Sequence, residues 1–208
     1  MFYGVDVDYR DYTVSLMDEK KKVVGLSHFW KEGFYWFVDH HKPDIITVNF
    51  PLEENSSKLK AAADLVQKLK KNFEYVVADK ELLKEKPEKI IVKTSADLFF
   101  KKIVRKELLP IHTREGIEQR IYNLRKTGIY LDKRMLSQKR NKLIRELNAV
   151  ICAFTSYSVE NNSYEIVEED GQQLIIPKYR FVPSSNRIKR RVPQGNQENA
   201  KTQAKNKD

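Results

Sequence analysis

Residues 2–30 read FYGVDVDYRDYTVSLMDEKKKVVGLSHFW and contain three runs rich in β-branched and aromatic residues, at 2–8, 12–18 and 22–30. Runs of this composition, bounded by polar residues, are typical of strands. The breaks between them are too short for a crossover connection, so neighbouring strands must pair in antiparallel fashion. We therefore expect the chain to begin with a three-stranded antiparallel meander.

Apolar segments alternate with segments of helical period in the next part of the chain. Residues 44–50 are almost continuously apolar and stop at Pro51, as expected for a strand covered on both faces. Residues 57–72 carry apolar side chains at helical spacing, and 74–79 and 89–93 have the composition of buried strands. Strands that alternate with helices in this way indicate parallel crossovers.

Helices dominate the part of the chain after Thr94. We expect three of them, the last and longest over residues 133–159, which changes at Leu147 from basic to small and apolar. Two short runs at 164–167 and 174–176 predict a closing hairpin. The expected fold is therefore α/β, with a mixed sheet in which an antiparallel three-strand meander precedes parallel strands, flanking helices and a C-terminal hairpin.

The chain divides into a folded part and a tail by its composition. Of its 208 residues 40% are apolar, which is enough to build a core over residues 1–183. Residues 184–208 have no apolar periodicity and many Asn, Gln, Lys and Ser. We expect one domain over 1–183 and a disordered basic tail over 184–208.

Positive charge is concentrated in two segments. The chain has a formal net charge of +10, while residues 101–146 hold 14 Lys or Arg against 5 Asp or Glu, and residues 184–208 hold 7 against 2. Such clustering is the electrostatic pattern of a phosphate-binding surface. A solvated Lys-rich face is the alternative reading of the same charge.

Several classes of protein are disfavoured by what the sequence lacks. Cys152 is the single cysteine, which excludes an internal disulfide and favours a reducing, cytoplasmic location. No apolar run reaches the roughly 20 residues that cross a bilayer, so we expect no membrane association. No glycine-rich phosphate loop is present, and we expect no cofactor of the nucleotide or nicotinamide type.

Five segments resemble an uncharacterised family of predicted nucleases with the ribonuclease H-like fold. The resemblance covers residues 1–180 and lies in the order and spacing of the segments, since none of them is specific alone. They are GVDVDYRDYTVSL (4–16), TVNFPL (47–52), IIVKTSADLFFKKI (90–103), LNAVICAFTSYSV (147–159) and IIPK (175–178).

The resemblance implies a nuclease site in which four carboxylates hold two magnesium ions. The first-strand Asp of the family is present as Asp6, whereas the other three acidic positions fall on Asn49, Lys93 and Asn148. The formal charge of the four side chains thus changes from −4 to 0. Because two divalent ions need anionic oxygen ligands, we expect no metal here and no catalysis.

Our hypothesis for these residues is a degenerate, pseudoenzyme site. We expect the Lys93 ammonium to stand beside Asp6 in place of a metal, with Asn49 and Asn148 completing a hydrogen-bonded cluster. A purely structural role for Asp6 and Asn148 is one alternative. A shifted register, in which Asp8, Asp97 or Glu146 is the working carboxylate, is another.

The basic segments supply the expected contacts to nucleic acid. In the tail these are Arg187, Lys189, Arg190 and Arg191, and in the helical part they are Arg134, Lys139, Arg140 and Lys142. We expect a nucleic-acid-binding protein, for RNA or DNA, that grips phosphates without reading bases. The alternatives are an active nuclease dependent on Mg or Mn, and a protein-interaction subunit of a larger complex.

Overall fold

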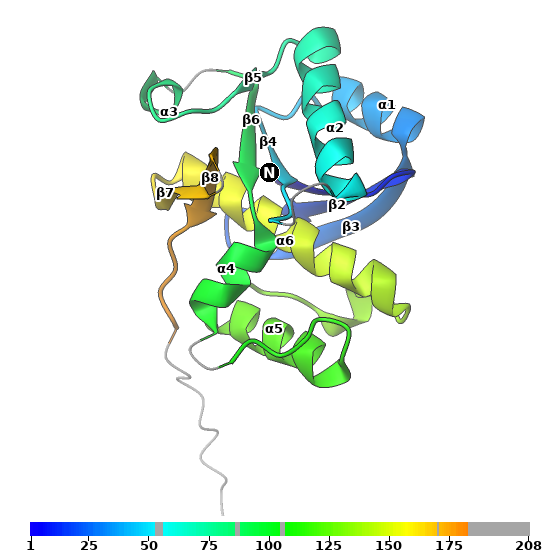
Figure 1. Ribbon diagram of the computed structural model, residues 1–208, viewed down its shortest axis with the longest axis vertical. Coiled ribbons are helices and arrows are strands. Elements are labelled where there is room, and N and C mark those ends of the chain that lie inside the picture. The colour runs from blue at the N-terminus through cyan, green and yellow to red at the C-terminus, as the bar shows by residue number, and fades with distance from the viewer. Residues whose placement is uncertain (53–55, 86–87, 105–106, 170, 183–208) are drawn as a thin grey trace, which may run out of the picture.

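A six-stranded mixed sheet with the strand order β3-β2-β1-β4-β6-β5 forms the centre of the molecule. The computed structural model (Figure 1) describes residues 1–52, 56–85, 88–104, 107–169 and 171–182. The strands are β1 (Phe2–Val7), β2 (Asp11–Met17), β3 (Val23–Trp30), β4 (Ile45–Asn49), β5 (Val76–Val77) and β6 (Ile90–Thr94).

The first three strands form the expected antiparallel meander. β1 pairs with β2, with Asp6 opposite Thr13, and β2 pairs with β3, with Thr13 opposite His28. The outer edge of β3 is partly covered at its start, where Val23 donates its amide to the carbonyl of Tyr130 and Tyr130 donates to that of Lys21.

The other half of the sheet is parallel, as the alternation of strands and helices predicts. β4 pairs in parallel with β1 and with β6, and its residues are buried from Ile46 onward. The strand expected at 74–79 is much shorter, because only Val76 and Val77 pair with β6. Glu74 has a left-handed conformation that ends the preceding helix, which leaves few residues for the strand.

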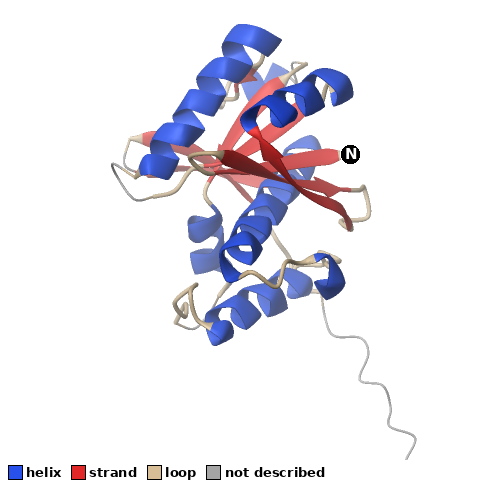
Figure 2. Ribbon diagram, turned by 90° about the vertical axis from the view of Figure 1, so that its right-hand side faces the viewer, coloured by secondary structure: helices blue, strands red, loops and turns tan. Residues whose placement is uncertain are grey.

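Helices cover both faces of the sheet, as Figure 2 shows. α1 (Lys31–His41) packs on the face to which Tyr12 points, since the Tyr12 and Phe34 rings lie 4.8 Å apart. Asp11, which precedes Tyr12 in β2, points to the opposite face of the sheet and contacts Arg145 of α6. The remaining helices are α2 (Ser57–Phe73), α3 (Leu82–Glu85), α4 (Ala96–Ile103), α5 (Arg114–Lys126) and α6 (Arg140–Glu160).

The backbone of α6 packs directly against the backbone of β1 at Gly4. A Cβ atom added to Gly4 would fall 2.0 Å from the Ala153 nitrogen and 2.3 Å from the Ala149 oxygen. The small and apolar residues in the second half of this helix are buried, among them Cys152. Glycine on the strand and alanine on the helix therefore permit an approach that larger side chains would prevent.

The helix expected over residues 133–159 is interrupted near its start. A single 3-10 turn, η1 (Lys133–Met135), precedes α6, and α6 begins only at Arg140. The side chain of Asp132 accepts the amide of Arg134, and the carboxylate of Glu146 accepts the amide of Ser137. These side-chain bonds replace helical backbone bonds and hold the segment outside the helix.

The closing hairpin is present as a second, two-stranded sheet. β7 (Tyr164–Glu169) and β8 (Gln172–Pro177) pair in antiparallel fashion. Lys102 of α4 forms an ion pair with Glu165 of β7.

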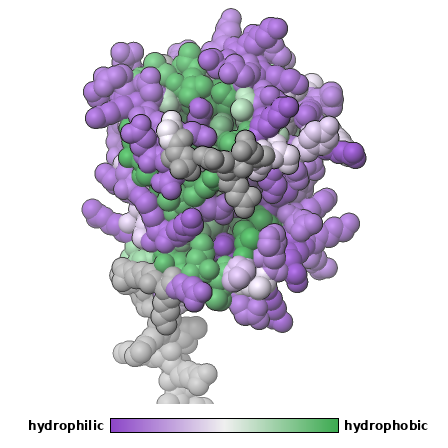
Figure 3. Space-filling model, in the orientation of Figure 1, coloured by the Kyte–Doolittle hydropathy of each residue, from purple (hydrophilic) through white to green (hydrophobic). Residues whose placement is uncertain are grey.

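On the face drawn in Figure 3, apolar residues are visible near the centre and hydrophilic residues cover the margins.

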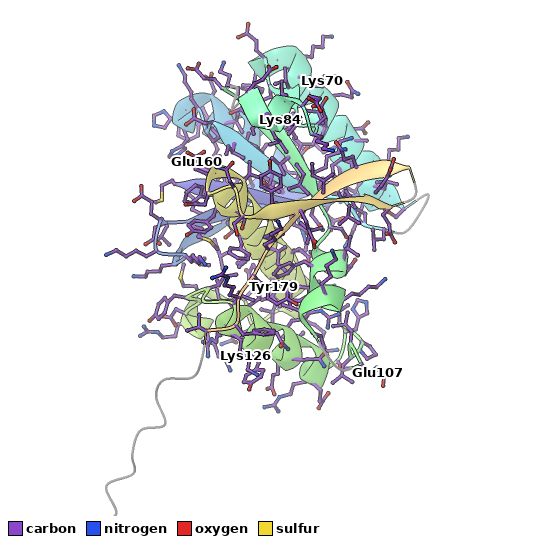
Figure 4. All side chains as sticks on the ribbon, turned by 90° about the vertical axis from the view of Figure 1, so that its left-hand side faces the viewer. Lys70, Lys84, Glu107, Lys126, Glu160 and Tyr179 are labelled. Atoms are coloured by element: carbon purple, nitrogen blue, oxygen red, sulfur yellow. The ribbon has the colours of Figure 1, made fainter. Side chains whose placement is uncertain are left out.

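The chain then runs from the hairpin to the end of α5. The hydroxyl of Tyr179 donates to the carbonyl of Lys102, and the amide of Val182 donates to that of Lys126 (Figure 4). The predicted tail, residues 184–208, lies outside the described residues. Within the described part of the chain, no helix is both long and apolar enough to cross a membrane.

Candidate functional site

A row of polar residues crosses five strands of the sheet on the face covered by α6. Asp6 of β1 stands opposite Thr13 of β2, and Thr13 stands opposite His28 of β3. On the other side of Asp6, Asn49 of β4 stands opposite Thr94 of β6. Because paired residues share a face of a sheet, this register gathers polar side chains beneath one helix.

Asp6, Asn49 and Asn148 meet at the centre of this row, as the sequence hypothesis predicts. The Asn49 amide donates to Asp6 Oδ1 at 2.7 Å, and the Asn148 amide donates to the same oxygen at 3.2 Å. The Asn49 carbonyl oxygen accepts the backbone amide of Ala96 at 3.0 Å, at the start of α4. All three side chains are buried, with Asp6 only 2% exposed.

The prediction that Lys93 stands beside Asp6 is wrong. The residue of β6 opposite Asn49 is Thr94, so Lys93 is opposite Val48 and belongs to the other face of the sheet. Its ammonium lies 5.2 Å from the centroid of the Phe50 ring. The cation beside Asp6 is Arg145, whose Nε lies 3.5 Å from Asp6 Oδ2.

Arg145 contacts three acidic residues near the turn that joins β1 and β2. Its Nη1 lies 2.5 Å from Asp11 Oδ1 and 3.6 Å from Asp8 Oδ2, and its Nη2 donates to the Asp11 carbonyl at 2.9 Å. The side chain is 9% exposed. Of the three carboxylates only Asp6 is buried, so the guanidinium balances its charge in the interior and reaches Asp8 and Asp11 nearer the surface.

A second polar chain runs from the sheet to the segment before α6. His28 Nδ1 lies 3.0 Å from Thr13 Oγ1, and His28 Nε2 lies 2.9 Å from Glu146 Oε1. The other oxygen of Glu146 accepts the amide of Ser137 at 2.7 Å. Glu146 thereby ties the loop before α6 to the meander.

Arg145 and His28 belong to this site, although the sequence alone did not point to either of them. Arg145 lies three residues before Asn148, a spacing that places both on one helix face and could have indicated it. The register of the meander could have indicated His28, because His28 stands opposite Thr13 and Thr13 stands opposite Asp6.

The carboxylates of the alternative register, Asp8, Asp97 and Glu146, each interact with different residues. Asp8 faces Arg145, and Glu146 is bound by His28 and Ser137. Asp97 lies in the first turn of α4, where its charge acts on Arg120. The described residues include no group of three or more His, Cys, Asp or Glu side chains arranged to hold a metal ion.

The donor set around Asp6 does not fit the two magnesium ions that the family resemblance implies. Asp6 Oδ1 already accepts hydrogen bonds from the amides of Asn49 and Asn148, and the guanidinium of Arg145 lies beside Asp6 Oδ2. Burial raises the pKa of Asp6 above its usual range, although the hydrogen bond from Asn49 and the charge of Arg145 oppose this. A carboxyl whose charged form is disfavoured is a poor ligand for a divalent cation.

A basic groove lies beside this cluster, between α5 and the segment that leads into α6. It has a volume of about 390 Å³ and an apolar floor that includes Ile117 and Leu143. Arg114, Lys133 and Arg140 line it together with Glu118, which pairs with Arg114 at 3.1 Å, so its excess positive charge comes from Lys133 and Arg140. The groove adjoins the first turn of α6, which contains no acidic residue and whose N-cap residue Lys139 makes no side-chain cap.

The four predicted phosphate contacts of the helical part are all exposed, and of these Arg140 lines the groove. Lys139, Arg140 and Lys142 form no ion pair with any other described residue. Arg134 is held by Asp132, with Nη2 and Oδ2 2.7 Å apart, and this hydrogen bonding lowers the pKa of Asp132 to about 2. The predicted contacts of the tail, Arg187, Lys189, Arg190 and Arg191, lie outside the described residues.

Comparison with known proteins adds no further assignment, since no family model and no curated protein matches the chain.

Proposed function

We propose that this protein binds nucleic acid through its phosphates and does not cleave it, and that its domain is a ribonuclease H-like fold with a degenerate site. The observation that carries the binding proposal is the set of cations Lys139, Arg140 and Lys142 at the start of α6, none of which forms an ion pair with another described residue. Cations at a helix N-terminus oppose the helix dipole, and α6 places no acidic residue there to offset them. A bound phosphate would satisfy both the dipole and the side chains.

The Asp6 cluster supports the absence of cleavage. Two-metal hydrolysis requires ligands that neutralise both ions, and Asp6 is instead paired with Arg145 and hydrogen-bonded by Asn49 and Asn148. The fold proposal is supported by the order of the sheet, in which an antiparallel meander precedes parallel strands with Asp6 on the central strand β1.

The binding proposal is tested by the salt dependence of affinity for a labelled 20-nucleotide oligomer. Changing Lys139, Arg140 and Lys142 together to Gln should flatten the slope of log affinity against log salt by about 2, since each phosphate contact contributes roughly 0.7–0.9. The matched control is Lys60→Gln, Lys70→Gln, Lys71→Gln on exposed positions of α2, in the opposite helical layer. Equal slopes for both triple variants would exclude α6 from contact.

The same oligomers, incubated with manganese, test the absence of cleavage. We expect them to remain intact. Cleavage that is abolished by Asp6→Asn would instead establish the active nuclease. A protein-interaction subunit would be indicated if the chain bound no oligomer and co-purified with a constant partner after nuclease digestion.

The predicted tail is tested separately by removing residues 184–208. We expect this truncation to reduce the salt slope further, because it removes seven Lys or Arg residues. An unchanged slope would exclude the tail from contact.

A further inference from the structure

Two large aromatic side chains are exposed at one corner of the sheet. Tyr9 lies in the turn between β1 and β2 and is 66% exposed, and Trp30 ends β3 and is 69% exposed. The Lys31 ammonium lies 5.6 Å from the centroid of the Tyr9 ring. We call Tyr9, Trp30 and Lys31 the aromatic corner.

The register of the meander places Trp30 on the same face of the sheet as α6. Trp30 pairs with Asp11, and both follow the alternation set by His28 and Thr13. Asp11 contacts Arg145 of α6. Directly opposite side chains in an antiparallel pair have Cβ atoms about 5 Å apart, so Trp30 stands next to the residue that anchors α6.

The aromatic corner therefore adjoins the proposed phosphate contacts. Lys142 lies three residues before Arg145, which corresponds to about 4.5 Å along the helix axis. Trp30 and Lys142 are thus neighbours of the two residues of the contact between Asp11 and Arg145. An exposed indole near cations that pair with no acidic group of the described residues combines the two features that single-stranded nucleic acid requires, a stacking surface for bases and charge for phosphates.

We propose that the ligand is single-stranded nucleic acid and that Trp30, with Tyr9, stacks on its unpaired bases. This inference rests on the proposed function. A duplex offers the same phosphates, but its bases are already stacked on one another and expose few ring faces. The Lys31 ammonium over Tyr9 adds positive charge at the ring that a neighbouring phosphate can use.

The second tryptophan provides a matched control within the same chain. The protein contains two tryptophans, and Trp36 is exposed to nearly the same degree as Trp30, 65% against 69%. Trp36 belongs to α1, in the helical layer opposite α6, and its ring is stacked on His40 at 5.1 Å. Its environment is thus aromatic and exposed, but it belongs to the helical layer on the face of the sheet opposite α6.

Tryptophan fluorescence tests the proposal without altering Trp30. In the variant Trp36→Phe, Trp30 is the sole tryptophan, and titration with oligothymidylate should quench its emission saturably. A duplex of the same length should quench it much less. In the variant Trp30→Phe, the emission of Trp36 should change with neither ligand. Absence of quenching of Trp30 by bound oligothymidylate would overturn the proposal.

Anisotropy of a labelled oligomer gives an independent measure of affinity. Trp30→Ala should weaken binding of the single strand by roughly 5- to 100-fold, as expected for the loss of one stacked base, and change duplex binding less than twofold. Trp36→Ala should change neither. If single strand and duplex both bind in a salt-dependent way and Trp30→Ala changes neither affinity, this inference alone is overturned. If neither binds, the proposed function is overturned as well.

Discussion

The Nε atom of Arg145 lies 3.5 Å from Oδ2 of Asp6, so that a guanidinium from α6 stands against the central carboxylate of the sheet. The pair is enclosed, because the two side chains are 9% and 2% exposed. A fixed cation within the fold thus takes the position beside Asp6 that a divalent ion would need. The helix and the strand are connected through charge as well as through apolar packing.

Removal of this guanidinium should be strongly destabilising. Arg145→Met leaves Asp6 and Asp11 without their cation, and breaking a buried pair from one side costs about 3–5 kcal/mol. Urea unfolding at neutral pH measures the loss. The control is Arg140→Met, one and a half turns earlier and exposed, which should change stability by less than about 0.5 kcal/mol. Equal effects of both substitutions would mean that the Asp6–Arg145 contact contributes nothing specific.

The pH dependence of stability should reveal the state of Asp6. Burial raises its pKa in the folded protein, so the folded state holds this proton more tightly than the unfolded chain. The resulting stability is fully present below the unfolded pKa, near 4, and is lost as the pH rises through the folded pKa.

Relative to wild type, Asp6→Asn should therefore become more stable as the pH is raised from 4 toward 8. Unfolding free energies of the two proteins at several pH values provide the measurement. The opposite trend would show that Arg145 and the two asparagines outweigh burial and lower the pKa of Asp6.

Gly4→Ala should disrupt the contact between β1 and α6. The added methyl group would meet backbone atoms at 2.0 and 2.3 Å, which cannot move aside as a flexible side chain can. We expect a loss of at least about 3 kcal/mol. Gly33→Ala in α1 is the control, because its added Cβ meets only the edge of Phe29 at 3.7 Å. There the helix should gain about 0.5–1 kcal/mol, and a similar loss at both sites would contradict the packing.

Divalent ions should not bind at Asp6 in the wild-type protein. Isothermal titration with manganese should show no binding at micromolar concentrations, because two amides and a guanidinium occupy the surroundings of this one carboxylate. Asn49→Asp combined with Arg145→Met adds anionic charge at this point and, in protein that circular dichroism shows to be folded despite the loss of Arg145, should introduce measurable binding. Micromolar binding by wild type that Asp6→Asn removes would identify a working metal centre.

The sequence was sufficient for the elements with strong local signals. The meander over residues 2–30 was predicted because its composition and short breaks permit few other arrangements, and β4 because an apolar run of that length must be covered on both faces. The meeting of Asp6, Asn49 and Asn148 followed from a resemblance in segment order, and the hydrogen bonds are consistent with it.

Features set by register and by long-range side-chain bonds could not be predicted in the same way. Lys93 and Thr94 are adjacent, yet the pairing of β6 with β4 directs them to opposite faces, and a shift of one residue exchanges them. The late start of α6 depends on Glu146 accepting the amide of Ser137. The side chain of Ser95 caps α4 by accepting the amide of Leu98, and the neighbouring Thr94 is buried against Thr155.

The contact of Tyr130 with the first residues of β3 also affects how separate copies of the protein meet. An outer strand with free amides and carbonyls can recruit a strand from another molecule and so begin polymerisation. Tyr130 occupies both hydrogen-bonding positions beside Lys22, through the amide of Val23 and the carbonyl of Lys21. The connection between α5 and α6 thus protects the molecule against intermolecular strand exchange at this border.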